Sequence, residues 1–148
     1  MSDNLEHNLV ALRLHYLAAG LNDFIARATK ARHGPREIIA EMVRSELADR
    51  QERTTARRLK EAKFGRFKPL ADFDWSWPKR IDRDGVDRLL TLDFMTENAN
   101  VILAGPQGIG KTMIGRNIAL AAVMAGQTAL VTTASQLVID LAQQESSR

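Results

Sequence analysis

The residues best suited to chemistry in this 148-residue chain form one glycine-rich stretch. It matches the G-x-x-x-x-G-K-[ST] pattern that binds the phosphates of nucleoside triphosphates. Glycines allow successive N–H groups to turn inward around phosphate oxygens, and a following helix adds the positive end of its dipole. We expect Lys111 to reach the β and γ phosphates and Thr112 to offer its hydroxyl to magnesium. The stretch comprises Gly105, Pro106, Gln107, Gly108, Ile109, Gly110, Lys111 and Thr112.

The segments on either side of this stretch fit the same role. Residues 101–104 form a short apolar run of strand type, and residues 113–125 carry apolar side chains at helical spacing. Strand, loop and helix therefore come in the order that a phosphate-binding loop requires. Two alternatives stay open at this point. One is a glycine-rich turn that binds nothing, and the other is a degenerate loop that keeps the sequence but has lost its ligand.

Composition narrows the class of protein. The chain has no cysteine, which excludes disulfides and zinc-thiolate sites, and its three histidines lack metal-ligand spacing. We find no secretory signal and no apolar run long enough to cross a bilayer, so we expect a cytoplasmic protein without a membrane partner. The net charge of +3 hides an asymmetry, because residues 1–70 carry a net charge of +5 and residues 71–148 a net charge of −2. The basic half is the candidate for a polyanionic partner.

The pattern of apolar residues predicts three parts. Residues 1–63 read as a small all-helical domain, with helices that end at Gly20, cover residues 21–32 and run from Pro35 towards Lys63. Residues 64–78 read as an extended linker whose aromatic side chains pin it to an apolar surface, although Phe73, Trp75 and Trp77 also alternate as a base-stacking platform would. Residues 79–148 hold a helix over 83–95, the loop, a second strand over 128–133 and a final helix over 134–144. We expect Leu137, Val138 and Leu141 of the final helix to point inward.

A group of basic residues near the end of the third helix is the candidate DNA contact. Residues 50–68 carry a net charge of +6, and several of the cations recur at steps of three and four residues, so a helix places them along one stripe. Such a stripe tracks phosphates and makes binding sensitive to salt. The alternative is a solvated helix face with internal ion pairs. The candidates are Arg50, Arg53, Arg57, Arg58, Lys60 and Lys63.

Several short segments together resemble a known family. They are FDW at 73–75, LDF at 92–94, ENANVILAGPQGIGKT at 97–112, AVMAG at 122–126 and VTTA at 131–134. In combination they resemble the IstB-like ATP-binding proteins, AAA+ helper ATPases of bacterial insertion-sequence transposition that are similar to the DnaC helicase loaders. The resemblance covers nearly the whole chain. It implies ATP and magnesium at residues 105–112 with Met113 packed near the nucleotide, double-stranded DNA bound by the N-terminal helices, a transposase partner and a homo-oligomer.

The same resemblance sets the expected fold and its limits. It implies an α/β fold, with a small all-helical N-terminal domain followed by the first part of a AAA+ P-loop domain. The acidic strand end, the sensor and the arginine finger of that domain do not appear before Arg148. We therefore expect a C-terminally truncated chain that binds ATP but does not hydrolyse it alone. A DnaC-like helicase loader and a non-functional remnant are the alternatives.

Overall fold

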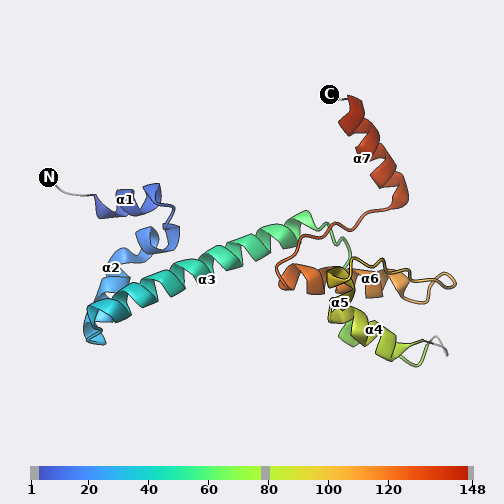
Figure 1. Ribbon diagram of the computed structural model, residues 1–148, viewed down its shortest axis with the longest axis horizontal. Helices are drawn as coiled ribbons and strands as arrows, with labels where there is room; N and C mark the ends of the chain where they lie inside the picture. Colours follow the sequence, from blue (N-terminus) through green and yellow to red (C-terminus); the bar gives the residue numbers. More distant parts are fainter. Residues whose placement is uncertain (1–3, 78–80, 147–148) are drawn as a thin grey trace. The chain divides into compact units, whose positions relative to one another are not determined.

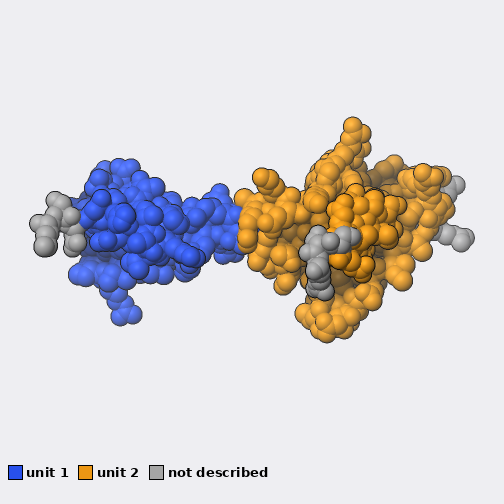
Figure 2. All heavy atoms as spheres, turned by 90° about the horizontal axis from the view of Figure 1, so that it is seen from above, with its two compact units in different colours: residues 1–54 blue, residues 55–148 orange. Residues whose placement is uncertain are grey.

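A computed structural model describes residues 4–77 and 81–146. The chain divides into two compact units, residues 1–54 and residues 55–148, which are coloured separately in Figure 2. The three-part organisation predicted from the sequence, with boundaries after residues 63 and 78, stays a prediction.

The first unit is helical, as the sequence predicted. It contains α1 (Leu5–Ala11), α2 (His15–Lys30) and the first part of α3 (Pro35–Glu61), all visible in Figure 1. Pro35 starts α3, and the Glu37 carboxylate accepts a hydrogen bond from the Gly34 N–H at 2.8 Å, which satisfies a donor at the helix start. A core of four buried side chains holds the unit together: Leu9, Leu17, Leu21 and Phe24.

The sequence predicted one helix that ends at Gly20, and a break does fall there, but α1 already ends at Ala11. Gly20 lies inside α2 with non-helical backbone angles, so it marks a kink, and the first helix ends earlier. Arg13 adopts a left-handed φ of +60°, while the Leu14 N–H bonds to the Leu9 carbonyl at 2.8 Å and the Arg13 N–H to the Val10 carbonyl at 2.8 Å. This pair of hydrogen bonds is the Schellman motif, which most often uses glycine at the left-handed position. Because position 13 holds arginine and not glycine, the sequence pattern did not predict this helix end.

Glu46 caps α2 from outside that helix. The residue that precedes α2 is Leu14, which has no side-chain acceptor, so the first N–H groups of the helix need another partner. The buried Glu46 carboxylate supplies it, because its Oε2 accepts hydrogen bonds from the N–H groups of Tyr16 at 3.0 Å and Leu17 at 3.3 Å. A carboxylate at this position also favours the helix dipole. Glu46 thereby fixes α2 against α3.

We predict that Glu46→Ala lowers the free energy of unfolding by about 1–3 kcal/mol, because it removes a helix cap and leaves buried donors unpaired. Glu52→Ala is the matched control, since Glu52 lies on the same helix and is exposed. Urea denaturation followed by circular dichroism measures both. Equal midpoints for the two variants contradict the assigned role.

The second unit is built around one helix, α6 (Lys111–Met124). Its other elements are the end of α3, the short 3-10 helix η1 (Leu70–Asp72), α4 (Arg83–Leu90), α5 (Asp93–Thr96) and α7 (Ala134–Ser146). The helix predicted over residues 83–95 is divided at Leu92, whose φ is +66°. The buried core joins α6 to α4 and to the segment after η1 through Phe73, Val86, Ile114 and Ile118.

The predicted α/β fold is wrong for the described residues, which contain helices and no β-strand. Residues 101–104 and 128–133, the two predicted strands, have no sheet partner there. Their backbone hydrogen bonds run elsewhere: the Val131 N–H donates to the Ala62 carbonyl at 2.9 Å, just after α3, and the Thr133 carbonyl accepts from the Leu137 N–H of α7 at 2.9 Å. A strand is defined by its ladder, so an apolar run without a neighbouring run stays irregular. Ile102, in the first segment, is 86% exposed.

The final helix is present but does not bury the predicted face. Leu137, Val138 and Leu141 of α7 were expected to point inward, yet they are 44%, 66% and 52% exposed. This expectation is therefore wrong, and α7 contributes no residue to either core cluster.

Of the helices in the described part of the chain, none combines the length and apolar character needed to cross a membrane.

Candidate nucleotide-binding site

The glycine-rich loop joins the extended segment 101–104 to the start of α6. Three of its glycines adopt positive φ: Gly105 at +154°, Gly108 at +84° and Gly110 at +89°. Gly110 is the N-cap of α6, and no side chain caps the helix there. The first N–H groups of α6 therefore face the loop without a side-chain acceptor, at the positive end of the helix dipole.

Two of these glycines are required for space as well as for conformation. A Cβ at Gly105 would collide with the Cδ1 of Ile109. A Cβ at Gly110 would lie 3.1 Å from the Cζ of Phe73 and closer still to its Cε2. A Cβ at Gly108, by contrast, would meet nothing within 4 Å. The loop is thus closely packed at both ends and open in the middle.

Lys111 closes the loop from its own helix. Its Nζ donates a hydrogen bond to the Gly105 carbonyl at 2.8 Å and another to the Pro106 carbonyl. The ammonium group is therefore held across the mouth of the loop by two neutral acceptors. Thr112, in the first turn of α6, is exposed, and its hydroxyl has no hydrogen-bond partner among the described residues.

The remaining loop residues differ in solvent exposure. Pro106 and Gln107 are exposed, whereas Ile109 is half-buried against Gly105. Met113 packs partly buried against the core of the second unit. The Ile109 side chain is thus part of the packing of the loop.

Asn117 anchors the segment before η1 to α6, and sequence reasoning missed it. Its Nδ2 donates to the Lys68 carbonyl at 3.0 Å and to the Met113 carbonyl at 2.8 Å, and its Oδ1 accepts from the Leu70 N–H at 2.9 Å. Asn117 is 8% exposed, so these bonds satisfy a buried amide. The feature of the sequence that could have identified Asn117 is its position as the one amide between Ile114 and Ile118, on the buried face of an apolar helix.

Within the second unit, residues 64–78 pack through some of their aromatic side chains. Phe73 is 8% exposed in the core and Trp75 packs against it, which confirms the expected packing for these two residues. Trp77 is 62% exposed. Between them, the Ser76 hydroxyl and then its N–H donate hydrogen bonds to Asp74, which lowers the pKa of that carboxyl below its usual value.

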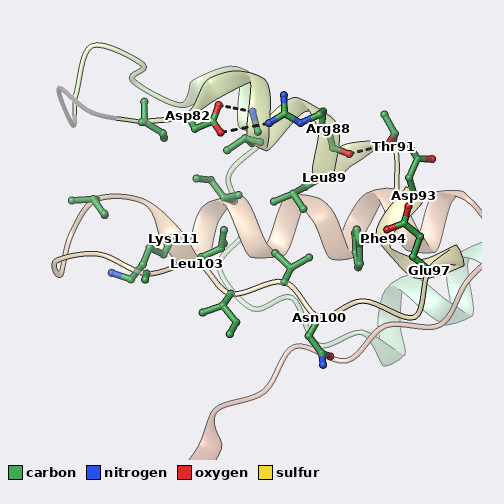
Figure 3. A pocket seen from close by; sticks show the side chains of 18 residues that line it. Asp82, Arg88, Leu89, Thr91, Asp93, Phe94, Glu97, Asn100, Leu103 and Lys111 are labelled. Atoms are coloured by element: carbon green, nitrogen blue, oxygen red, sulfur yellow. Dashed lines mark hydrogen bonds and ion pairs between the residues drawn. The ribbon is translucent and has the colours of Figure 1, made fainter.

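A cavity of about 730 Å³ lies beside the loop, between α4 and α5 on one side and residues 100–104 on the other. Figure 3 shows Lys111 and Leu103 on the loop side and Leu89 on the α4 side. Three carboxylates line it: Asp82, Asp93 and Glu97. Two cations, Arg88 and Lys111, also line it, and Arg88 lies 3.6 Å from Asp82, so the lining carries charges of both signs.

The six basic candidates differ in burial and in whether they have a partner within the protein. In the first unit, Arg50 donates to the Arg13 carbonyl at 3.2 Å, and Arg53 pairs with Asp49 at 2.7 Å and Glu46 at 3.8 Å. In the second unit, Arg58 is half-buried beside Gly126. The other three are exposed and form no ion pair or side-chain hydrogen bond within the described residues: Arg57, Lys60 and Lys63.

A glycine-rich loop that ends in Lys-Thr at an uncapped helix start is the defining feature of the P-loop class. Comparison with known proteins narrows the class to a family. The model of the family described as IstB-like ATP binding protein matches residues 7–147. The chain belongs to this family.

Individual relatives agree with the family match. A protein from Pseudomonas aeruginosa, named as an ATP-binding protein of insertion sequence IS21, is 33% identical over 93% of this chain and 52% of its own length. An IS21-like relative from Bacteroides fragilis is 30% identical over 93% of this chain and 69% of its own length. A Geobacillus stearothermophilus relative named for IS5376 is 30% identical over 71% of this chain and 42% of its own length. The chain spans about half the length of the curated relatives it matches.

We predict that Asn117→Ala loosens the segment before η1, because it leaves the Leu70 N–H and the Lys68 carbonyl without their partner. The free energy of unfolding should fall by about 1–3 kcal/mol. Trypsin cleavage after Arg66 should become faster under native conditions. Asn100→Ala is the control, since Asn100 is exposed. Wild-type stability together with a wild-type cleavage rate would show that Asn117 is dispensable.

Proposed function

We propose that this chain binds ATP through residues 105–112 and serves as an ATP-binding helper in the transposition of an insertion sequence. The observation that carries the proposal is the arrangement of the loop. Three glycines with positive φ lead into an uncapped helix start, and the Lys111 ammonium is held across the loop mouth. Membership of the IstB-like ATP binding family and the names of the relatives support the same ligand.

The residues present fit a triphosphate. A Cβ at Gly105 or Gly110 would collide with Ile109 or Phe73, so glycine is needed at both ends for the loop to keep this conformation. The N–H groups at the start of α6 lack a side-chain acceptor and are open to phosphate oxygens. Phosphate oxygens are better acceptors for Lys111 than the two neutral carbonyls, because charge-assisted hydrogen bonds are stronger. Thr112 would hold magnesium through its hydroxyl, as P-loops do. No group of three or more His, Cys, Asp or Glu side chains in the described residues is arranged to hold a metal ion.

Lys111→Ala should abolish ATP binding, because Lys111 is the cation that the structure places at the loop mouth. Isothermal titration calorimetry with magnesium and ATP measures the affinity of each chain. Lys68→Ala is the control, since Lys68 is exposed in the same unit and contributes its backbone carbonyl to the contact with Asn117. Equal affinities for wild type and Lys111→Ala would refute the proposal.

Transposition also requires contact with DNA, and we propose that double-stranded DNA binds the exposed cations at the end of α3. Arg57, Lys60 and Lys63 support this role because they are solvent-accessible and have no internal acidic partner in the described part of the chain. Arg50 and Arg53 have internal partners instead. Contacts of this kind bind phosphates without reading base sequence.

The triple variant Arg57→Ala, Lys60→Ala, Lys63→Ala should weaken DNA binding and flatten its salt dependence. Each lost phosphate contact reduces the slope of log K against log salt by about 0.9, so three contacts reduce it by about 2.7. Fluorescence anisotropy with a labelled duplex at several salt concentrations gives the slope. The control is Arg27→Ala, Lys30→Ala, Arg36→Ala, which removes the same charge from other exposed positions. Two equal slopes would show that the end of α3 is not the contact surface.

The partners of the whole protein follow from the same reasoning. The matched relatives are named for insertion sequences, which favours a transposase partner over the helicase of a DnaC-like loader. Assembly into a homo-oligomer and location in the cytoplasm are further parts of this proposal. The absence of ATP hydrolysis by this chain alone stays a prediction.

A further inference from the structure

The phosphate-binding loop is in contact with an aromatic side chain far from it in the sequence. Phe73 packs so closely on Gly110 that a Cβ at Gly110 would overlap the ring, 3.1 Å from Cζ and nearer to Cε2. Gly110 has a φ of +89° and forms the N-cap of α6. The Phe73 ring therefore lies against the residue that sets the direction of the first N–H groups of that helix.

Phe73 is itself held on several sides. It is 8% exposed and packs in the core with Ile114 and Ile118 of α6 and Val86 of α4. The Trp75 ring lies 4.7 Å from it, centre to centre, at an interplanar angle of 50°. The Arg83 guanidinium lies 4.9 Å from the centre of the Trp75 ring, a cation–π distance. The ring is thus a fixed surface, and the conformation of Gly110 has to fit it.

We propose that Phe73 is a positioning residue for the phosphate-binding loop. It acts by confining Gly110 to the left-handed conformation that aims the first N–H groups of α6 at the phosphates. The inference rests on the proposed ATP binding and adds a residue that the loop motif does not contain. It also assigns the aromatic pair a role inside the protein, because burial of Phe73 and the cation above Trp75 leave neither ring open for a nucleic-acid base.

Coupling between residues 73 and 110 is the property that a merely structural Phe73 would lack. Gly110→Ala should weaken ATP binding about tenfold or more, because alanine is strained at this φ and also strikes the Phe73 ring. Phe73→Leu removes the ring atoms that the new Cβ would meet. In that background, the loss of ATP affinity caused by Gly110→Ala should therefore be smaller by a factor of about three or more. Trp77→Leu is the matched control. Trp77 is 62% exposed, so in its background Gly110→Ala should cost as much as in the wild type.

The experiment measures ATP affinity by calorimetry for the wild type, the three single variants and the two double variants, with thermal unfolding of each to establish that it is folded. A cost of Gly110→Ala that is the same in the wild-type, Phe73→Leu and Trp77→Leu backgrounds overturns the inference. A smaller cost in the Phe73→Leu background alone supports it.

A second readout separates this inference from the proposed function. In the chain without nucleotide, Phe73→Leu should speed hydrogen exchange of the amides of residues 110–112 more than Trp77→Leu does. If the wild type shows no Lys111-dependent ATP binding, the proposed function fails, while faster exchange still supports the positioning role. Equal exchange in the two variants overturns the positioning role whatever the ATP affinity.

Discussion

The second unit depends on how residues 66–75 are fastened to α6. Asn117 binds the backbone of this segment with a buried amide, and Phe73 enters the core that α6 shares with α4. An asparagine in an apolar helix is tolerable because all its hydrogen bonds are made within the protein. Its three bonds fix the register of the segment, and that register brings Phe73 to Gly110. The glycine-rich loop is therefore shaped by its own residues and also by a segment about thirty-five residues earlier in the chain.

In the first unit, too, a buried polar side chain holds two segments together, and here it is the charged Glu46. Glu46 is buried because it replaces the cap that Leu14 cannot provide for α2. Arg53 lies 3.8 Å from the second oxygen of that carboxylate, and Arg50 holds the carbonyl of Arg13, in the turn between α1 and α2. These two arginines are thus part of the packing of the unit. Basic residues that look equivalent in the sequence divide into those with internal partners and those open to a phosphate, and this division decides which of them are credible DNA contacts.

The sequence predicted the features that depend on local chemistry. The start of α3 at Pro35 and a helix directly after the glycine-rich loop both follow from short-range rules. The α/β fold was wrong, because an apolar run of strand type becomes a strand when another run pairs with it, and residues 101–104 have no such partner in the described chain. The ends of α1 at Ala11 and of α4 at Leu90 were missed because Arg13 and Leu92, which follow them, take left-handed angles that glycine usually supplies. Asn117 and the contact of Phe73 with Gly110 were not predicted, because both depend on contacts between distant segments.

The proposed function depends on whether the loop, as α6 and Phe73 hold it, binds a triphosphate. Nuclear magnetic resonance of the 15N-labelled chain during a titration with magnesium and ATP tests this most directly. We expect saturable shifts at one equivalent that are concentrated at the amides of Gly108, Gly110, Lys111 and Thr112. No shift at these amides, or shifts that follow the exposed cations at the end of α3 and vanish with added salt, would contradict it.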